Sequence, residues 1–540
     1  MVDAMKGASR ESVADFLVVG GGVAGLRAAI ELARAGSVLL LSKGTTSQST
    51  TYHARGGIAV AMGEDTEDMT LHFRETLRAG DGLCREEAVR VLVEEGALEI
   101  RRLAEWGVPF EFRQHSTASR GQPNVVRARG GSIGSEILRV LTAKANSLKS
   151  LHTKRHCTVI ELHVQGGCVR GATCLDESSG QIRKVRAAAV LLATGGLGQV
   201  YAETTNPPGA CGAGVALAYR AGALLADMEF IQFYPTVLPA ASGSRVVLPE
   251  ALRERGAKLR NLELDRFMPR YHEAGELAPP DVVSRAIITE IQRSRGSFVY
   301  LDLTELHEGE VKLRFPDVYA ACLESNIDIA SDLVPVRPAA HFAVGGVATD
   351  LHGATTLEGL YAAGETATTG LHGASRLANN ALLEGLIYGT HAAAAMIAGR
   401  KLSARREPPP SSAGADFAGS VTAPERAQLE SVARDVRNLM WDQVGVIRDE
   451  RKLKLAAERL NAIRWPDRAR ADRSYVETWN LLEVARLITR CALARKESRG
   501  VHYRADAPLR NDSEPPQHSY VSLQTGVYFR PDTVPEAHAR

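Results

Sequence analysis

Residues 15–41 read DFLVVGGGVAGLRAAIELARAGSVLLL, with two apolar runs separated by glycines and an alanine-rich segment. The apolar residues 15–19 predict a buried parallel strand. Residues 26–35 are rich in alanine and leucine and stop at Gly36, which predicts a helix with a glycine C-cap. Residues 37–41 predict a second strand. Strand, helix and strand in this order form a βαβ unit, so we expect an α/β fold.

A glycine-rich turn joins the first strand to the helix. Gly20, Gly22 and Gly25 match the G-x-G-x-x-G spacing in the strand-to-helix context that the motif requires. These glycines permit a tight turn, backbone approach to a pyrophosphate and close helix packing. The helix N-terminus adds unpaired N–H groups and partial positive charge. We predict that a dinucleotide cofactor is bound by Gly20, Gly21, Gly22, Val23, Ala24 and Gly25.

The end of the second strand disfavours NAD as this cofactor. An NAD site needs an acidic residue for the ribose about 20 residues after the glycines. Ser42, Lys43 and Gly44 stand there instead. Two interpretations of Lys43 stay open, namely contact with the cofactor or simple solvation.

Residues 359–385 read GLYAAGETATTGLHGASRLANNALLEG. An acidic residue, Glu365, follows a predicted strand, and the surrounding glycines let backbone approach a ligand. Together with the dinucleotide motif, this arrangement predicts a flavin. The one arginine, Arg376, marks a site for an anionic substrate, with a structural salt bridge as the alternative.

A polar loop that ends in two glycines follows the second strand. It is well placed to run along a flavin ring, and an ordinary surface loop is the alternative. The residues that we assign to the cofactor here are Thr50, Thr51, Tyr52, His53, Ala54, Arg55, Gly56 and Gly57.

The bulk composition narrows the class of protein. The chain has 540 residues and a net charge of +2 with scattered basic residues, which argues against a nucleic-acid-binding protein. Seven cysteines without a CxxC pair argue against a disulfide framework and a metal site, and indicate a reducing cytoplasm. The polar residues 1–12 predict no signal peptide, and no apolar run has the length of a membrane span.

The predicted strands that run into glycines lie far apart in the sequence, which indicates a discontinuous nucleotide domain. We expect an α/β fold, with a Rossmann-like FAD-binding domain at residues 1–235 and 345–400 and an inserted α+β capping domain at 236–344. We further expect a linker at 401–423, a C-terminal helical bundle at 424–506 and an extended tail at 507–540.

Seven short blocks carry a resemblance to a known family. They are LSKG at residues 41–44, GELAP at 275–279, PAAHF at 338–342, GGV at 345–347, GLHGASR at 370–376, MWD at 440–442 and RKESRG at 495–500. With these blocks the chain resembles, over nearly its whole length, the flavoprotein family of succinate dehydrogenase, fumarate reductase and L-aspartate oxidase. The resemblance is strongest to the L-aspartate oxidase branch.

The resemblance implies that FAD is bound without a covalent link. The dehydrogenases carry the flavin on a histidine six residues before the first glycine of the loop's Gly-Gly pair, and here that position is Thr50. It also implies that Glu365 contacts the cofactor, and that Ala381 and Leu382 lie under the flavin at a helix start.

The resemblance also implies a site for a four-carbon dicarboxylate. His341 matches the substrate-binding histidine of the family, and Arg376 matches its carboxylate-binding arginine. Tyr234 replaces a second substrate-binding histidine, and its hydroxyl retains the ability to donate a hydrogen bond to a carboxylate.

The most serious departure from the family lies at Pro280. Relatives have a proton-transfer arginine there, whereas proline carries no charge and donates no proton. The candidates to supply the missing charge are Arg253, Arg255 and Arg285, of which we place Arg285 with His341, Arg376 and Tyr234 in the catalytic set.

The resemblance implies oxidation of L-aspartate to iminoaspartate, with hydride passing from Cα to flavin N5 and electrons to O2 or fumarate. This is the first step of de novo NAD biosynthesis, and it implies a quinolinate synthase as the next enzyme. Two alternatives follow from the departures. One is a divergent paralogue that oxidises a different amino or hydroxy acid, and the other is a flavin-binding protein without catalysis.

Overall fold

The structure is a computed structural model of the chain. It describes residues 11–62, 66–111, 124–128, 132–239, 245–403, 421–465 and 470–531. Residues 404–420 of the predicted linker therefore lie outside the described residues.

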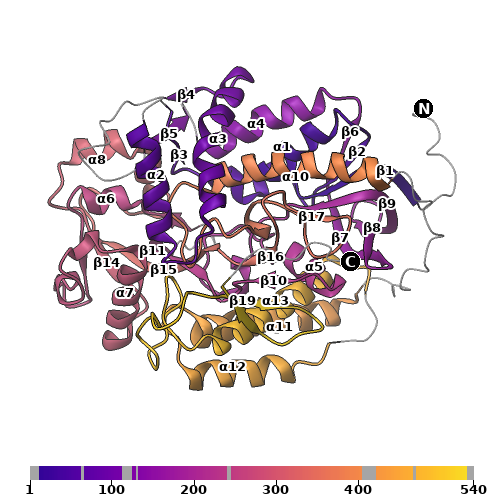
Figure 1. The fold of residues 1–540 in the computed structure, drawn as a ribbon. Coiled ribbons are helices and arrows are strands. Elements are labelled where there is room, and N and C mark those ends of the chain that lie inside the picture. The colour runs from indigo at the N-terminus through magenta and orange to yellow at the C-terminus, as the bar shows by residue number, and fades with distance from the viewer. Residues whose placement is uncertain are drawn as a thin grey trace.

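A seven-stranded sheet lies in the right half of the molecule as drawn in Figure 1. Its strand order is β6-β2-β1-β9-β8-β7, with β17 also pairing with β9, and the strands are β1 (Glu11–Val19), β2 (Val38–Leu41), β6 (Leu151–Lys154), β7 (Cys157–Gln165), β8 (Cys168–Asp176), β9 (Gln181–Leu192) and β17 (Leu360–Ala362). Strand β1 pairs in parallel with β2 and β9, so that Val18 lies opposite both Leu40 and Leu191. Strand β17 pairs in parallel with β9. The predicted βαβ unit is confirmed, and three strands that run into glycines lie next to one another.

Both faces of this sheet are covered, which explains the unbroken apolar run of β1. Phe16 and Val18 pack into one core with α1 (Val23–Leu32), α3 (Glu86–Glu105), α4 (Ile133–Asn146) and α10 (Ala381–Ser403). Leu17 and Val19 point to the opposite core, which includes α5 (Ala213–Ala221). The fold is therefore the expected Rossmann-like α/β arrangement. Smaller elements beside it are α2 (Thr66–Ala79) and a sheet in the order β3-β5-β4, with β3 (Ile58–Ala59), β4 (Phe110–Glu111) and β5 (Val125–Ala128).

Helix α10 is unusually apolar for its length. Within the part of the chain that the structure describes, Ala381–Arg400 is the one helical segment long and apolar enough to cross a membrane. However, 61% of this segment is buried inside the protein, against α1 and the sheet. A core helix of a soluble protein passes the same test, so this segment is weak support for a membrane span.

A second, five-stranded sheet forms the inserted region, drawn in pink in Figure 1. Its order is β12-β11-β15-β14-β13, with β11 (Ile231–Leu238), β12 (Val246–Val247), β13 (Lys258–Arg260), β14 (Val299–Asp302) and β15 (Val334–Ala343). The helices of this region are α6 (Glu250–Glu254), α7 (Pro280–Ser294), α8 (Glu308–Arg314) and α9 (Pro316–Leu323). It has its own apolar core, which supports the proposed capping domain. Strands β11 and β15 connect this domain with the flavin domain.

Three long helices follow the linker: α11 (Ala423–Val444), α12 (Glu450–Ala462) and α13 (Arg473–Ala494). The capping box predicted at the start of α11 is present, because Thr422 accepts from the Glu425 amide and Glu425 accepts from the Thr422 amide. Val436 and Leu482 pack into the core beneath the main sheet. The predicted helical C-terminal domain therefore lies against the flavin domain (Figure 1).

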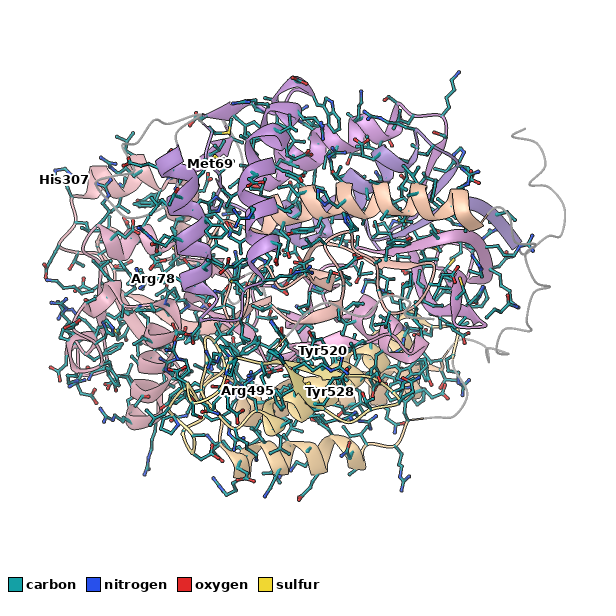
Figure 2. The ribbon with its side chains drawn as sticks, in the orientation of Figure 1. Met69, Arg78, His307, Arg495, Tyr520 and Tyr528 are labelled. Atoms are coloured by element: carbon teal, nitrogen blue, oxygen red, sulfur yellow. The ribbon has the colours of Figure 1, made fainter. Side chains whose placement is uncertain are left out.

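The prediction of an extended tail beyond residue 506 is wrong for the described residues. β19 (His518–Val521) and β20 (Tyr528–Arg530) form the edge of a sheet ordered β18-β16-β10-β19-β20, with β10 (Leu225–Ala226), β16 (Gly346–Ala348) and β18 (Ala367–Thr368). Tyr520 is buried and stacks on Tyr528, and both lie near Arg495 in Figure 2. A four-residue strand is too short to show an alternating pattern among proline and polar residues, so no local signal marks it.

Candidate active site

The glycine turn after β1 has the backbone geometry of a pyrophosphate cradle. Gly20 has φ +119°, and a Cβ there would lie 2.0 Å from the Ala193 carbonyl oxygen. A Cβ at Gly25 would lie 1.9 Å from the Gly20 oxygen, so both positions require glycine. At Gly22 the nearest atom to a Cβ is Thr51 Oγ1 at 3.4 Å. Gly22 thus faces space that a ligand can enter, in front of the first turn of α1, which lacks a side-chain cap.

Glu365 sits at the Gly-Glu turn that follows β17. Its Oε1 accepts a hydrogen bond of 3.1 Å from the Ala343 amide. A Cβ at Gly196 would lie only 2.2 Å from the same oxygen, so the glycines after β9 make room for this carboxyl. Burial raises the pKa of Glu365 to about 7, which Arg376 partly opposes. The glycine cradle, the open helix start and this half-buried carboxyl together fit a bound FAD.

The loop at residues 50–57 lies between the glycine turn and the start of α10. Thr51 Oγ1 accepts from the Val23 amide at 3.2 Å, and a Cβ at Gly56 would lie 2.6 Å from Asn379 Oδ1. Asn379 comes just before Ala381 and Leu382, the first residues of α10. The loop side chains that are exposed are those of Tyr52, His53 and Arg55, whereas Thr50, Thr51 and Ala54 are half-buried. The cofactor residues assigned from the sequence therefore come from segments that the fold brings together.

Lys43 makes contacts that neither of its two interpretations anticipated. Its Nζ lies 2.8 Å from the Gly209 carbonyl oxygen and 2.8 Å from Glu477 Oε1, and 3.5 Å from Cys211 Sγ. The ammonium group therefore connects the flavin domain to helix α13 and is not simply solvated. Glu477 lies more than 400 residues from Lys43, which is why the sequence did not indicate this pairing.

His341 lies on β15 and is within hydrogen-bonding distance of a neighbouring loop. Thr205 Oγ1 is 2.7 Å from His341 Nδ1, and Asn206 Nδ2 donates to the His341 carbonyl oxygen at 2.8 Å. Burial, and secondarily the charge of Arg376, lowers the pKa of His341 to about 3, so the imidazole is neutral near pH 7. Thr205 and Asn206 are not among the site residues predicted from the sequence. Their polar run before two prolines indicated only a loop.

Arg376 is a cation without an anionic partner among the described residues. Its guanidinium lies 4.4 Å from the centre of the Phe342 ring. Its one hydrogen bond among these residues runs from Nη1 to the Leu377 carbonyl oxygen at 3.5 Å, and Nε is buried with no partner there. No salt bridge to Arg376 is present in the described ranges. An enclosed guanidinium nitrogen without a partner is costly, and an incoming carboxylate removes that cost.

Tyr234 lies beside this pair of residues. Its ring centroid is 5.3 Å from that of His341, and its hydroxyl oxygen accepts from the Glu250 amide at 3.0 Å. Burial raises the pKa of Tyr234 to about 12, although Arg253 and Arg376 lower it. The phenol is therefore protonated near neutral pH and has its hydrogen available to donate.

Arg285 is not joined to this group. On α7 it pairs with Asp281 at 2.7 Å and lies 4.7 Å from the centre of the Tyr503 ring. In the described part of the chain, no hydrogen bond, ion pair or ring contact links it to His341, Tyr234 or Arg376. The sequence could not rank Arg285 against its neighbours, because the direction of each side chain depends on tertiary packing.

Arg253, the buried one of the three candidates, is the better placed cation. It is 2% exposed and donates from Nη1 to the Glu276 carbonyl oxygen. Its Nε and Nη2 make no hydrogen bond with the described residues, and Nη2 lies 3.4 Å from Glu250 Oε1. Arg253 and Arg376 both lie close enough to Tyr234 for their charges to lower its pKa.

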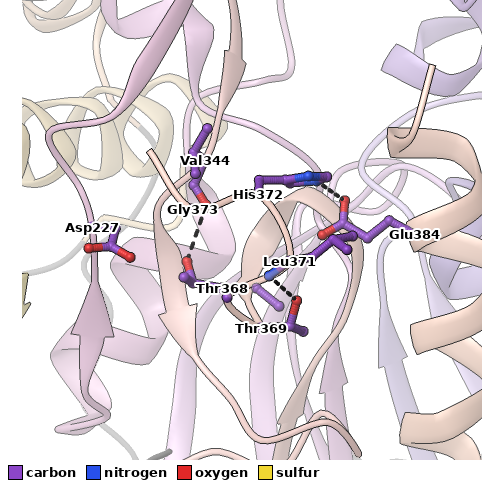
Figure 3. A pocket seen from close by; sticks show the side chains of 10 residues that line it. Asp227, Val344, Thr368, Thr369, Leu371, His372, Gly373 and Glu384 are labelled. Carbon is purple, nitrogen blue, oxygen red and sulfur yellow. Dashed lines mark hydrogen bonds and ion pairs between the residues drawn. The ribbon is translucent and has the colours of Figure 1, made fainter. Parts of the chain in front are cut away.

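A small cavity is lined mainly by the segment that precedes α10 (Figure 3). Its lining includes Asp227, Thr368, His372 and Glu384. His372 Nε2 is 3.1 Å from Glu384 Oε2, and Thr368 Oγ1 donates to the Val344 carbonyl oxygen at 3.4 Å. These contacts hold the segment between Glu365 and Arg376 in place. Among the described residues there is no group of acidic, histidine and cysteine side chains that suits a metal ion.

Comparisons with known proteins agree with this geometry. The family described as "FAD binding domain" matches residues 15–382, and "Fumarate reductase flavoprotein C-term" matches residues 433–531. The L-aspartate oxidase of Pseudomonas aeruginosa is 39% identical over 520 residues, covering 92% of this chain and 95% of that protein. The L-aspartate oxidase of Streptomyces coelicolor is 40% identical over 538 residues, covering 94% and 91%.

Solved structures show the same fold. A quinol-fumarate reductase with menaquinol molecules superposes with a TM-score of 0.84 at 28% identity, covering 97% of this chain and 98% of that chain. A mutant of the E. coli quinol fumarate reductase gives a TM-score of 0.82 at 27% identity, with 97% coverage of both chains.

Proposed function

Because the chain belongs to the flavoprotein family that includes the L-aspartate oxidases, we propose that it binds FAD and oxidises L-aspartate to iminoaspartate. One observation carries this proposal, namely the half-buried guanidinium of Arg376, which has no anionic partner in an ion pair among the described residues and lies near the Glu365 carboxyl. Ala343 links the two sites, since it binds Glu365 and lies two residues after His341 on β15. An anionic substrate at Arg376 would therefore lie close to the Glu365 carboxyl that we assign to the flavin.

The protein residues of this site bind and orient the substrate. Arg376 binds one carboxylate by charge-assisted hydrogen bonds, and the neutral His341 and Tyr234 contribute hydrogen bonds beside it. Arg253 places a second positive charge near Tyr234 and is the candidate to supply the charge that is missing at Pro280. Bound FAD supplies the hydride acceptor. The contacts to the substrate carboxylates would hold its Cα close to this acceptor, and this positioning raises the rate of hydride transfer.

We further propose that FAD is held without a covalent link, since Thr50 offers no nucleophile for one. Electrons then pass to O2 or fumarate. The reaction is the first step of de novo NAD biosynthesis, and we propose that it takes place in the cytoplasm and supplies a quinolinate synthase. Seven cysteines without a CxxC pair support this location.

Turnover with a panel of substrates tests the proposal. Purified holoenzyme in air is given L-aspartate, L-asparagine, L-glutamate, L-malate or succinate, and peroxide and oxaloacetate (from hydrolysis of iminoaspartate) are measured. We expect both products with L-aspartate and far slower turnover with the other compounds. Preference for another amino or hydroxy acid would instead support the divergent paralogue, which Tyr234 and Pro280 favour. If none of these compounds is turned over, the result would instead support a flavin-binding protein without catalysis.

A further inference from the structure

The loop at residues 203–206 forms a clamp on β15 next to the active site. The Ala340 amide donates to the Glu203 carbonyl oxygen at 2.8 Å, and the Thr205 amide donates to the Ala340 oxygen at 3.0 Å. Asn206 holds the carbonyl of His341 through its side-chain amide. The loop therefore fixes the backbone of His341 independently of any contact to its ring.

The hydroxyl of Thr205 makes the contact to the ring, and the geometry indicates its direction. Two acceptors lie within reach of this hydroxyl, the Ala340 carbonyl oxygen at 3.4 Å and His341 Nδ1 at 2.7 Å. The Ala340 oxygen already accepts from Thr204 Oγ1 at 2.9 Å and from the Thr205 amide at 3.0 Å. Since a carbonyl oxygen has two lone pairs, both are used. The Thr205 hydrogen is therefore directed to His341 Nδ1.

The protonation of the ring follows from this bond. A neutral imidazole carries one hydrogen, and the nitrogen that accepts a hydrogen bond is the one without it. Nδ1 accepts from Thr205, so the hydrogen of His341 resides on Nε2. Nε2 makes no hydrogen bond with the residues that the structure describes. It is also not an enclosed atom, so a ligand can reach it. Nε2–H is thus free to donate to a ligand.

We propose that Thr205 is a positioning residue that holds His341 as the Nε2–H tautomer, so that His341 donates a hydrogen bond to a substrate carboxylate. In this tautomer Nε2 accepts no proton, so His341 is a carboxylate-binding group and another group takes the proton from the substrate ammonium. The inference rests on the proposed function, because it assigns the ring nitrogen that meets the substrate.

Thr204 offers a matched control. It belongs to the same loop, but its hydroxyl donates to the Ala340 carbonyl oxygen and accepts from the Asn206 amide at 3.1 Å, and it makes no bond to the imidazole. Thr204→Val and Thr205→Val each remove one hydroxyl with little change of volume, and both leave the bonds between backbone atoms of the loop in place. Thr205→Ser keeps the hydroxyl that the proposal requires.

The first experiment measures carboxylate binding to the oxidised holoenzyme. Malonate, a dicarboxylate without an amino group, is titrated into each variant while the flavin absorbance is followed. We expect Thr205→Val to raise the Kd about 10- to 100-fold, because a hydrogen bond to a charged group is lost. In the same variant KM for L-aspartate rises more than kcat falls. Thr204→Val and Thr205→Ser keep a Kd close to that of the unmodified protein. Equal effects of Thr205→Val and Thr204→Val on the Kd would overturn the proposal.

The second experiment detects the tautomer directly. Nitrogen NMR of protein labelled at its histidines separates Nδ1–H from Nε2–H rings, and the His341→Gln variant identifies the signals of His341. We expect the Nε2–H form in the unmodified protein and its loss in Thr205→Val; an Nδ1–H ring in the unmodified protein contradicts the proposal. This measurement needs no substrate. If malonate does not bind and L-aspartate does not react, the proposed function fails, while the NMR result still decides the role of Thr205.

Discussion

The charge of single residues decides what the active site can bind. Arg376 is half-buried beside Phe342 without an ion-pair partner in the described residues, whereas Arg285 is paired with Asp281. We expect Arg376→Gln to lower kcat/KM for L-aspartate about 10- to 100-fold, since a charge-assisted bond to carboxylate is lost. Arg285→Gln should lower it less than about 5-fold, as for a partly exposed ion pair. Steady-state kinetics at saturating FAD compares the two variants, and the reverse order would restore Arg285 to the catalytic set.

Glu365 gives the apoprotein a stability that depends on pH. Its pKa is about 7 in the folded protein against 4.5 for an ordinary glutamate, because burial disfavours the charged form. The stabilisation is thus fully present below about pH 4.5 and is lost as the pH rises through about 7. A glutamine resembles the protonated carboxyl, so Glu365→Gln should stabilise the apoprotein at pH 8 by up to about 3 kcal/mol and change it little at pH 5. Thermal unfolding of both apoproteins at both pH values tests this, and an equal shift at pH 5 and 8 would rule it out.

At the scale of elements, two glycines in the turn between β1 and α1 have different roles. Gly25 is needed for folding, and Gly22 is needed for cofactor binding. A Cβ at Gly25 collides with the backbone at 1.9 Å, whereas a Cβ at Gly22 meets only Thr51 Oγ1 at 3.4 Å. We expect Gly22→Ala to fold but to bind FAD weakly, because the methyl group occupies the path of the pyrophosphate. Gly25→Ala should lose soluble, folded protein. Far-UV circular dichroism reports folding and the visible flavin absorbance reports occupancy. A flavin-loaded Gly22→Ala protein would contradict the assignment.

The elements differ in how far the sequence alone could predict them. The unit β1-α1-β2 was predictable because its strands, helix and glycines follow one another within residues 15–41. The cluster of His341, Arg376 and Tyr234 required a resemblance, because β11, β15 and the segment before α10 meet only in the folded chain. Three findings could not be predicted because they depend on side-chain direction or on partners distant in the sequence. They are the choice of Arg253 over Arg285, the bond of Thr205 to His341 and the strand pairing of β19. Local sequence patterns predict neither the direction of a side chain nor its distant partners.

At the scale of the molecule, the C-terminal strands hold the flavin domain and the helical domain together. His518 pairs with Asp227 at 2.5 Å, and Ser519 donates to Glu229, which also pairs with Arg495 at the end of α13. This network of buried charges connects β10, β19 and α13. The last strands are therefore part of the core and not an appendage.

Substitution within β19 tests this role. Tyr520 is 2% exposed, whereas the nearby Leu523 is 52% exposed. Tyr520→Ala should destabilise the protein by about 3–5 kcal/mol, as for truncation of other buried aromatic side chains, and lower the apparent Tm. Leu523→Ala removes a side chain that is largely in water and should leave the Tm nearly unchanged. A similar Tm for both variants would place β19 outside the cooperative core.

The whole arrangement brings a flavin cradle and a carboxylate site to the junction of two domains, and anaerobic titration tests it most directly. Purified holoenzyme is mixed without oxygen with increasing L-aspartate while the visible absorbance of the oxidised flavin is recorded, with L-asparagine as the matched amino acid that lacks the second carboxylate. We predict complete bleaching by L-aspartate, little by L-asparagine, and recovery of the absorbance on admission of air or fumarate. A flavin that stays oxidised at saturating L-aspartate would contradict the account.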